Sequence, residues 1–358
     1  MSAVIDETAG VPAHYGSPFA EERELRAGRA FVDVAHFDVV TVAGADRVSW
    51  LTNLSTRDFS QLAVGEASEM LILDPNGHVQ EAAAAQLTED AVWLITDSGR
   101  GATLATFLDS MRFMLRVEVT LREDVTVFGT GAPASALPAA VVENSLLTWE
   151  DPWPRTLTGG ADYGIPDAAH PAADSRRTLV VAEKVKAGAV VAGFEAAGWS
   201  RAGLLAWEAA RVADRRPRVG AEGAAERVLP HELDWLRTAV HLNKGCYRGQ
   251  ETVAKIVNLG RPPRRLTYLY LEGPEGDLPE VGAEVLSERG RKVGVLTSVV
   301  RDADEGPVAL ALLKRSTSVE EVLSVGGFAA SQEVIVSPEG KSSVSPATRP
   351  GAELRGRK

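Results

Sequence analysis

Two periods of hydrophobic positions alternate along the first part of the chain. Residues 31–42 (FVDVAHFDVVTV) are rich in β-branched and aromatic side chains, which predicts one or two strands around a turn. Directly afterwards, Val48, Leu51 and Leu54 follow the spacing of one helical face, so we expect a helix that begins near Asp46. The pattern thus indicates strands and a helix close together.

Residues 69–87 have the pattern of a β-hairpin. The Asp-Pro-Asn-Gly segment at 74–77 is a strong turn signal between two runs of strand character. A further strand is predicted at 91–96, and alternation returns at 117–130. Between these two, an apolar stripe predicts a helix that contains Leu104, Phe107, Leu108, Met111 and Met114. This mixture of hairpins and helices predicts an α+β fold rather than repeated βαβ units.

The pattern changes after Gly260. Before it, residues 204–215 have few helix breakers and are predicted to form a helix. After it, short strands are expected at 266–273, 284–300 (a hairpin) and 308–315. Strands at this spacing indicate a small, separate β-barrel or sandwich.

These patterns divide the chain into four segments. Residues 1–24 are expected to be a flexible N-terminus. Residues 25–260 are expected to form an α/β body, and residues 261–336 are expected to form the C-terminal β-barrel. Residues 337–358 have almost no large apolar side chains, which predicts a disordered tail.

Composition excludes several classes of protein. The chain has 358 residues, 45% of them hydrophobic, and a formal net charge of -11, which is unlike a dedicated nucleic-acid binder. Its single cysteine excludes an internal disulfide framework and a multi-cysteine metal site. The N-terminal sequence lacks the pattern of a secretory signal, and no apolar run has the length of a membrane span. We therefore expect a cytoplasmic protein.

The single cysteine lies in the octapeptide KGCYRGQE at residues 244–251. Residues 241–243 (HLN) are predicted to end a strand, and residues 251–260 (ETVAKIVNLG) are predicted to form a helix. The octapeptide would then be a strand-to-helix turn, in which both glycines permit left-handed backbone or the close approach of a ligand.

Two interpretations of the octapeptide remain open. Lys244, Arg248 and the free N–H groups at the helix start would attract an anion and favour the reactive thiolate form of Cys246. In the alternative, Cys246 and Tyr247 are inert core residues, because free cysteine is among the most buried residue types. Gln250 and Glu251 would then be ordinary residues of the first helical turn.

The octapeptide, with Gly260 and Arg264-Arg265-Leu266 after it, resembles the signature of the YgfZ family. That signature is K-G-C-Y-x-G-Q-E followed by V-A-R after one residue; the chain matches all eight positions and has Lys255 in place of the arginine. These are folate-binding proteins that are related to the T-protein of the glycine cleavage system, an aminomethyltransferase. They are implicated in making or maintaining iron–sulfur clusters, including those of radical enzymes that modify tRNA.

The resemblance extends over about residues 25–315 and is weak at 131–200. The elements that carry it are Asp33, Ala35 and His36, then Gly44 and Asp46, then Leu62 and Gly65, then the PHEL segment at 230–233. It implies a T-protein-like fold, in which two ferredoxin-like α/β modules and a C-terminal β-barrel surround a central cavity of folate size. We expect Trp207 to be a core residue rather than a platform on which a pterin stacks.

The chain departs from the aminomethyltransferase pattern at two places. The acidic pair of the first hairpin is replaced by Gln80 and Glu81, and we expect Glu81 to be a solvated hairpin residue. On the helix before PHEL, the family arginine is absent from the segment that contains Glu208, although Arg211 follows nearby. Aminomethyl transfer of the glycine-cleavage type is therefore not expected.

The resemblance implies a folate-binding accessory factor for iron–sulfur client proteins, with tetrahydrofolate as its ligand, no resident metal and a monomeric state. In this hypothesis Cys246 faces the central cavity as a thiolate, which holds a cluster or sulfur transiently or attacks a one-carbon unit. Lys244 and Glu251 would act beside it. The folate contacts would come from Tyr247, Arg248, Gln250, Glu81, Glu208 and Arg211. The alternative is a folate-dependent one-carbon transferase or demethylase, in which Glu81 is the general base.

Overall fold

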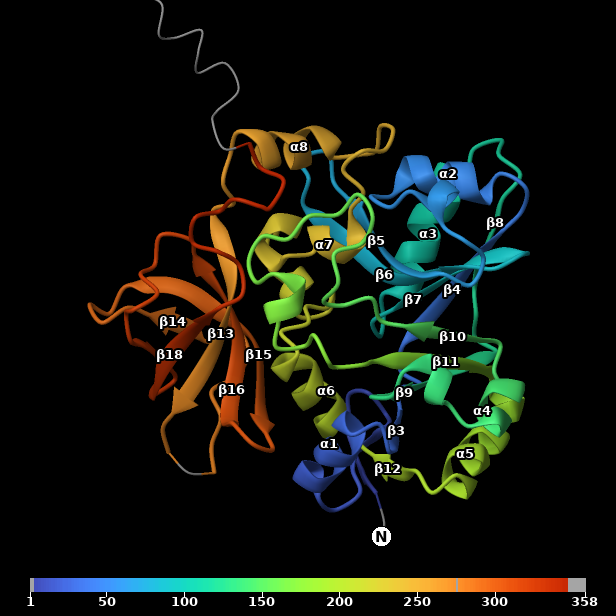
Figure 1. The fold of residues 1–358 in the computed structure, drawn as a ribbon, viewed down its shortest axis with the longest axis horizontal. Helices are drawn as coiled ribbons and strands as arrows, with labels where there is room; N and C mark the ends of the chain where they lie inside the picture. Colours follow the sequence, from blue (N-terminus) through green and yellow to red (C-terminus); the bar gives the residue numbers. More distant parts are fainter. Residues whose placement is uncertain (1–2, 275, 347–358) are drawn as a thin grey trace, which may run out of the picture.

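The computed structural model describes residues 3–274 and 276–346. It contains two five-stranded sheets, of which one is antiparallel and the other has one parallel pair of strands, and a closed, antiparallel six-stranded barrel (Figure 1). The barrel lies beside the two sheets, and α6 and α1 lie between the barrel and the second sheet (Figure 1). The predicted T-protein-like α+β fold with a C-terminal barrel is confirmed.

The first sheet has the strand order β5-β6-β7-β4-β8 and carries two helices. The apolar face of α2, which contains Leu51 and Leu54, packs with Leu104 and Leu108 of α3 in one buried cluster. The elements are β4 (Asp38–Ala43), α2 (Arg47–Leu54), β5 (Ala67–Leu73), β6 (Val79–Leu87), β7 (Ala91–Thr96), α3 (Gly101–Met111) and β8 (Glu118–Leu121). The hairpin predicted at 69–87 and the helix predicted near Asp46 are confirmed. The prediction that this second helix includes Met114 is wrong, because α3 ends at Met111 and the Met114 side chain is 89% exposed in the following turn.

The second sheet has the order β10-β11-β9-β3-β12. One face packs against α4 and α5 through Phe31, Val190 and Phe194. The other face packs against α1 and α6 through Leu25 and Trp207. The elements are α1 (Pro18–Arg26), β3 (Ala30–Asp33), β9 (Val125–Thr130), α4 (Ala139–Glu143), β10 (Leu147–Glu150), β11 (Thr178–Glu183), α5 (Ala187–Ala196), β12 (Ser200–Ala202) and α6 (Leu204–Ala213).

The barrel follows the order β13-β16-β15-β14-β17-β18 and closes through the β13–β18 pairing. Along each strand, side chains that point into the barrel alternate with side chains that point outward. Leu269, Leu296 and Leu313 are inward-pointing residues of three different strands, and they pack together in the barrel core. The strands are β13 (Arg264–Glu272), β14 (Glu284–Leu286), β15 (Lys292–Asp302), β16 (Gly306–Lys314), β17 (Leu323–Val325) and β18 (Phe328–Val334). Two helices, α7 (Leu236–Ala239) and α8 (Gln250–Asn258), connect the body to the barrel. None of the helices within 3–274 and 276–346 is long and apolar enough to cross a membrane.

Both ends of the chain are more ordered than predicted within the described residues. Residues 3–24 include the hairpin of β1 (Val4–Ile5) and β2 (Pro12–His14) and most of α1. At the other end, Ser337 N donates to Tyr163 O at 2.8 Å and Ser343 N donates to Asp162 O at 3.2 Å. The prediction of disorder is therefore wrong for residues 337–346, and the rest of that predicted tail, 347–358, lies outside the described residues.

Two buried carboxyl groups meet where α1 contacts the barrel. Glu22 of α1 and Asp302 at the end of β15 are both buried. Arg26 Nη1 lies 3.4 Å from Glu22 Oε1 and 3.2 Å from Asp302 Oδ2, and Ala303 N donates to Glu22 Oε2 at 2.9 Å. Burial, together with the neighbouring Asp302 carboxylate, raises the pKa of Glu22 to about 8 from an ordinary value of 4.5.

This pair predicts a pH-dependent stability. The folded chain retains a proton on Glu22 that the unfolded chain releases, so the associated stability is complete below the unfolded pKa and is lost as pH rises through about 8. We expect Glu22→Gln to reduce the fall in urea midpoint between about pH 5 and about pH 9. Arg23→Gln is the control: it removes the exposed ion pair with Asp304 at the same contact and should leave the fall in urea midpoint unchanged. The same fall in Glu22→Gln as in the unchanged protein would contradict the prediction.

Candidate functional site

The octapeptide spans the end of the loop between α7 and α8 and the first two residues of α8, so it joins two helices rather than a strand and a helix. His241 N donates to Thr56 O at 2.9 Å, and Leu242 N donates to Gly159 O at 2.8 Å. The predicted strand at 241–243 is therefore wrong, because this backbone bonds to two separate loops and not to the edge of a sheet.

Lys244 fixes the start of the octapeptide. Its Nζ donates to the carbonyl oxygens of Thr52, of Ser55 at 2.6 Å and of Arg57 at 3.1 Å, at the C-terminal end of α2. An ammonium group has three donors, so these carbonyl oxygens use all of them and none remains for the Cys246 thiol. Burial lowers the pKa of Lys244 to about 8. Lys244 therefore acts as a helix cap and an anchor.

Tyr247 and Gln250 hold the middle of the octapeptide. Tyr247 is buried in the same apolar cluster as Val253 and Val257 of α8, as its interpretation as a core residue predicted. The Lys244 Nζ lies 4.8 Å from the centre of the Tyr247 ring, and Gln250 Nε2 donates to Lys244 O at 3.5 Å. Burial raises the pKa of the Tyr247 hydroxyl.

Gly249 docks the octapeptide onto the hairpin turn at 74–77. Its φ is +82°, and a Cβ atom added there would lie 2.7 Å from Asp74 O and 2.9 Å from Gly77 Cα. A Cβ atom added to Gly245 would meet open space. Only the second glycine of the octapeptide is therefore needed for left-handed backbone and close approach.

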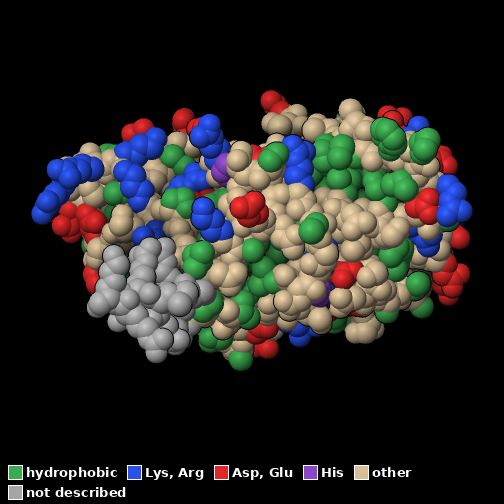
Figure 2. Space-filling model, turned by 90° about the horizontal axis from the view of Figure 1, so that it is seen from above, with side chains coloured by type: hydrophobic (Ala, Val, Ile, Leu, Met, Phe, Trp, Pro, Cys, Tyr) green, Lys and Arg blue, Asp and Glu red, His purple; other side chains and the backbone are tan. Residues whose placement is uncertain are grey.

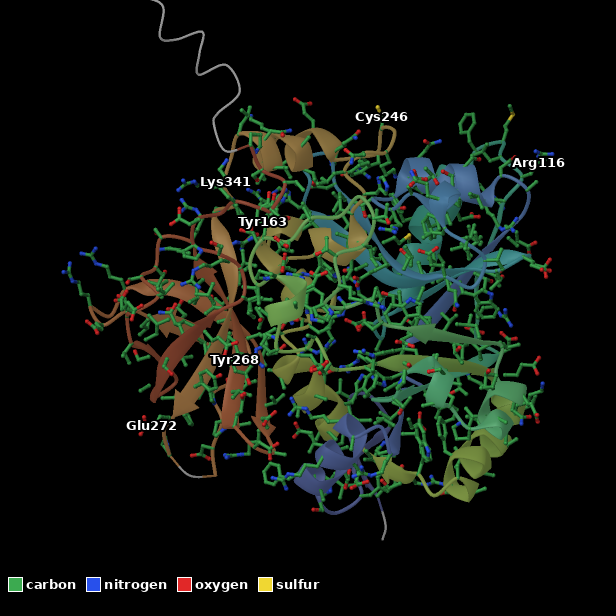
Figure 3. All side chains as sticks on the ribbon, in the orientation of Figure 1. Arg116, Tyr163, Cys246, Tyr268, Glu272 and Lys341 are labelled. Carbon is green, nitrogen blue, oxygen red and sulfur yellow. The ribbon has the colours of Figure 1, made fainter. Side chains whose placement is uncertain are left out.

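Cys246 lies at the outer end of this anchored loop and is exposed (Figure 3). Arg248 and Glu251 are exposed as well. Cys246 is not among the residues that line the central pocket, so the expectation that it faces that pocket is wrong, as is its alternative role in core packing. Within the described ranges, no three His, Cys, Asp or Glu side chains are grouped in a way that could hold a metal ion.

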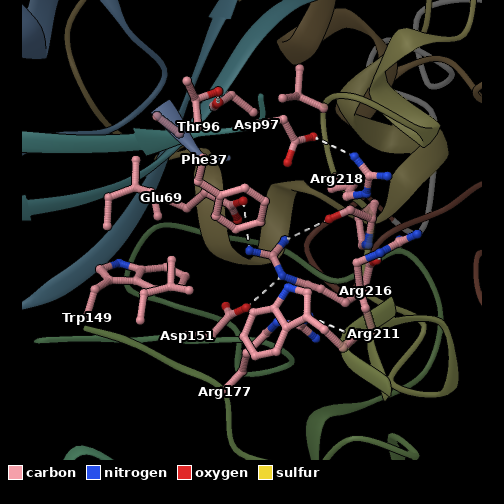
Figure 4. Close-up of a pocket in the computed structure, with 18 of the residues that line it drawn as sticks. Phe37, Glu69, Thr96, Asp97, Trp149, Asp151, Arg177, Arg211, Arg216 and Arg218 are labelled. Carbon is pink, nitrogen blue, oxygen red and sulfur yellow. Dashed lines mark hydrogen bonds and ion pairs between the residues drawn. The ribbon is translucent and has the colours of Figure 1, made fainter. Parts of the chain in front are cut away.

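The central pocket, here called the inner pocket, has a volume of about 90 Å³ and lies between the two sheets and α6 (Figure 4). Aromatic side chains line one part of it: Phe37, Trp149, Trp207 and Trp235. Charged side chains of both signs line the rest: Glu69, Asp97, Asp151, Glu208, Arg177, Arg211, Arg216 and Arg218. Trp207 is both a core residue and a wall of this pocket.

The charges of the inner pocket are paired with one another. Arg216 donates to Glu69 at 2.8 Å and to Asp151 at 2.9 Å, and so joins the two sheets (Figure 4). The Arg177 guanidinium lies 3.5 Å from the centre of the Trp207 ring, and burial lowers the pKa of Arg177 to about 10.

Glu208 and Arg211 of α6, which the resemblance implied as folate contacts, both line the inner pocket. Arg211 Nη2 lies 3.0 Å from Glu208 Oε2. Burial opposes ionisation of Glu208, but Arg211 and Arg218 together hold its pKa at about 2.

Glu81 does not line the inner pocket, yet it is not the solvated residue that we expected. Its side chain is 6% exposed and lies 2.9 Å from Arg100 Nε. Burial raises the pKa of Glu81 against the opposing effect of Arg100. Successive side chains of β6 point to opposite faces of the sheet, so Gln80 is exposed and Glu81 is buried. The expectation that Glu81 is solvated is therefore wrong.

Several residues of the inner pocket were missed at the sequence level. Asp97 directly follows the strand that was predicted at 91–96, and Arg216 and Arg218 belong to the run RRPR at 215–218. A carboxylate at the end of a buried strand and a basic run at the end of a helix were the available signals. Neither signal identifies the oppositely charged side chain with which the residue pairs, because the two segments meet only in the folded chain.

The docking of Gly249 gives a stability prediction with an internal control. Gly249→Ala should lower the free energy of unfolding by about 1–3 kcal/mol, because it places a side chain at positive φ and against Asp74 O. Gly245→Ala, in the same loop, should change it by less than about 0.5 kcal/mol. Urea unfolding of both variants measures the difference, and equal midpoints would contradict the proposed docking.

Comparisons with known proteins agree with this architecture. Residues 11–140 match the family model of the GCVT N-terminal domain. A presumptive chloroplastic transferase of Arabidopsis thaliana is 26% identical over 313 residues, which cover 84% of this chain and 68% of the relative. The aminomethyltransferase of Thermotoga maritima is 24% identical over 347 residues, which cover 93% of this chain and 92% of the relative.

The fold agrees with a solved structure over nearly the whole chain. The glycine cleavage system aminomethyltransferase T from Bartonella henselae superimposes with a TM-score of 0.71 at 17% identity, and 95% of each chain is covered. The chain therefore has the fold of the T-protein, and its residues 11–140 resemble the GCVT N-terminal domain in sequence.

Proposed function

We propose that the chain is a folate-binding accessory protein that supports the assembly or repair of iron–sulfur clusters in client enzymes, including radical enzymes that modify tRNA. Cys246 is its reactive residue. The observation that carries the proposal is an exposed thiol at the end of a loop that Lys244, Tyr247 and Gly249 fix to a T-protein-like body.

The residues of the inner pocket suit the pterin ring of tetrahydrofolate in kind. Trp149 and Trp207 offer flat faces for stacking, and the carboxylates of Asp97 and Glu208 accept hydrogen bonds from ring amino groups. Trp235 Nε1 is buried without a hydrogen-bond partner in the described residues and suits a carbonyl oxygen. The volume of about 90 Å³ is below the roughly 300–1,000 Å³ of ligand pockets, so binding needs a rearrangement.

Cys246 supplies one thiolate, which is too few ligands for a stable cluster. A cluster or sulfur atom on this thiol is therefore cargo, and the client or a small thiol provides the remaining ligands. Glu251 lies on the first turn of α8, and Lys244 and Gln250 position the loop.

Two measurements separate the folate site from the thiol. Anaerobic calorimetry with tetrahydrofolate should give micromolar binding by both the unchanged protein and Cys246→Ser, because the thiol lies outside the pocket. The unchanged protein should restore activity to a cluster-depleted client enzyme, and Cys246→Ser should not. Absence of binding by both proteins would contradict the folate site, and full restoration by Cys246→Ser would contradict the role of the thiol.

A second candidate is a folate-dependent one-carbon transferase or demethylase, and buried Glu81 favours it. Its carboxylate has a raised pKa and a single guanidinium partner, Arg100, as expected for a general base. In this reading, Glu81→Gln slows the consumption of methylene-tetrahydrofolate with a panel of small amines by about 100-fold or more. The exposed Glu89→Gln on the same hairpin is the control. Unchanged consumption in Glu81→Gln would remove this candidate.

A further inference from the structure

A second, larger cavity adjoins the inner pocket. This outer groove has a volume of about 750 Å³ and lies between α1, α6, the segment 220–225 and β15 of the barrel. Its walls are mainly apolar, and its exposed rim includes Phe19, Leu205, Leu278 and Val281. Glu208 and Arg218 belong to the linings of both cavities, so these two side chains form the partition between them.

Arg218 closes the partition through its side chain. Its Nη1 lies 3.2 Å from Asp97 Oδ2, and its Nε lies 3.2 Å from Glu208 Oε2. The guanidinium thus bridges the end of β7 to α6 across the opening, as the Arg218–Asp97 pair in Figure 4 shows from the side of the inner pocket.

Among the paired arginines of the inner pocket that carry ion pairs, Arg218 has the most exposed side chain. Its side chain is 35% exposed, whereas those of Arg211 and Arg216 are 4% and 8% exposed. Water can therefore replace part of the contacts of Arg218 when its ion pairs break, while pairs that are fully buried are costlier to break. Arg177 is stacked on Trp207 and is held by the Trp207 carbonyl oxygen at 3.0 Å.

The main chain around Arg218 is held by hydrogen bonds that do not involve the guanidinium. Arg218 N donates to Glu222 Oε2 at 3.1 Å, and Glu222 is buried among Arg211, Thr297 and Ser298. On the other side of the opening, Gly220 N donates to Asp97 Oδ2. Asp97 is therefore also held by a contact that does not involve the Arg218 guanidinium.

We propose that Arg218 is an access gate, which shuts the inner pocket until a ligand enters from the outer groove and displaces its guanidinium. The proposal rests on the folate site proposed above and deepens it. Displacement removes one N–H donor from each of the carboxylates of Asp97 and Glu208, so the incoming ligand must supply replacement N–H donors. The gate therefore selects heterocycles with a guanidine-like edge, such as the 2-amino-pyrimidinone of a pterin.

Association kinetics test the gate. Stopped-flow fluorescence of the pocket tryptophans follows the binding of tetrahydrofolate to the unchanged protein, Arg218→Ala and Arg218→Gln. Both variants remove the closed state, so we expect the association rate constant to rise by about tenfold or more. Arg218→Gln retains most of the side-chain volume and serves if Arg218→Ala does not fold. The exposed Arg112→Ala, which loses only a surface pair with Asp109, should keep the original rate.

The outcomes separate the gate from the folate site. Binding with the same association rate constant in all proteins would overturn the gate and leave the folate site standing. Absence of tetrahydrofolate binding even in the Arg218 variants would overturn both, because the opened pocket would then refuse the ligand that it is proposed to take.

Discussion

The body of the protein depends on one buried guanidinium, that of Arg216, between two carboxylates from different sheets. Glu69 comes from β5 of the first sheet, and Asp151 directly follows β10 of the second sheet. Burial of three charges is costly, and the cost is offset only when each charge keeps its partner and its geometry. The two sheets are therefore held at one separation, and that separation defines the inner pocket.

The barrel is attached by the same kind of contact. Glu222 accepts hydrogen bonds from Arg211 of α6 and from Thr297 and Ser298 of β15. Because Glu222 also accepts from Arg218 N, the position of the gate residue is tied to the barrel. Loss of Glu222 would leave Arg211 buried without one of its two carboxylate partners, so the packing of the barrel and the shape of the pocket cannot vary independently.

Much of the fold could be predicted from the sequence because it is encoded in local periods. The hairpin around 74–77, the helix after Asp46 and the barrel strands follow from apolar spacing and turn residues. The burial of Glu81 could not be predicted, because it depends on Arg100, which precedes α3. The same holds for the inner pocket, whose carboxylates and guanidiniums come from segments far apart in the chain. The octapeptide could be identified from the sequence. The different structural roles of its residues follow only from the three-dimensional contacts of Lys244 and Gly249.

These contacts also decide between two kinds of chemistry for Cys246. Attack on a one-carbon unit of a folate in the inner pocket would require the thiol to reach that pocket. Cys246 is instead exposed, and the loop that carries it is anchored on one side to the end of α2 and on the other to the hairpin turn. Movement of the thiol to the pocket would break the Lys244 cap and expose Tyr247 from the core. The architecture therefore keeps the inner pocket and the exposed thiol as two separate sites.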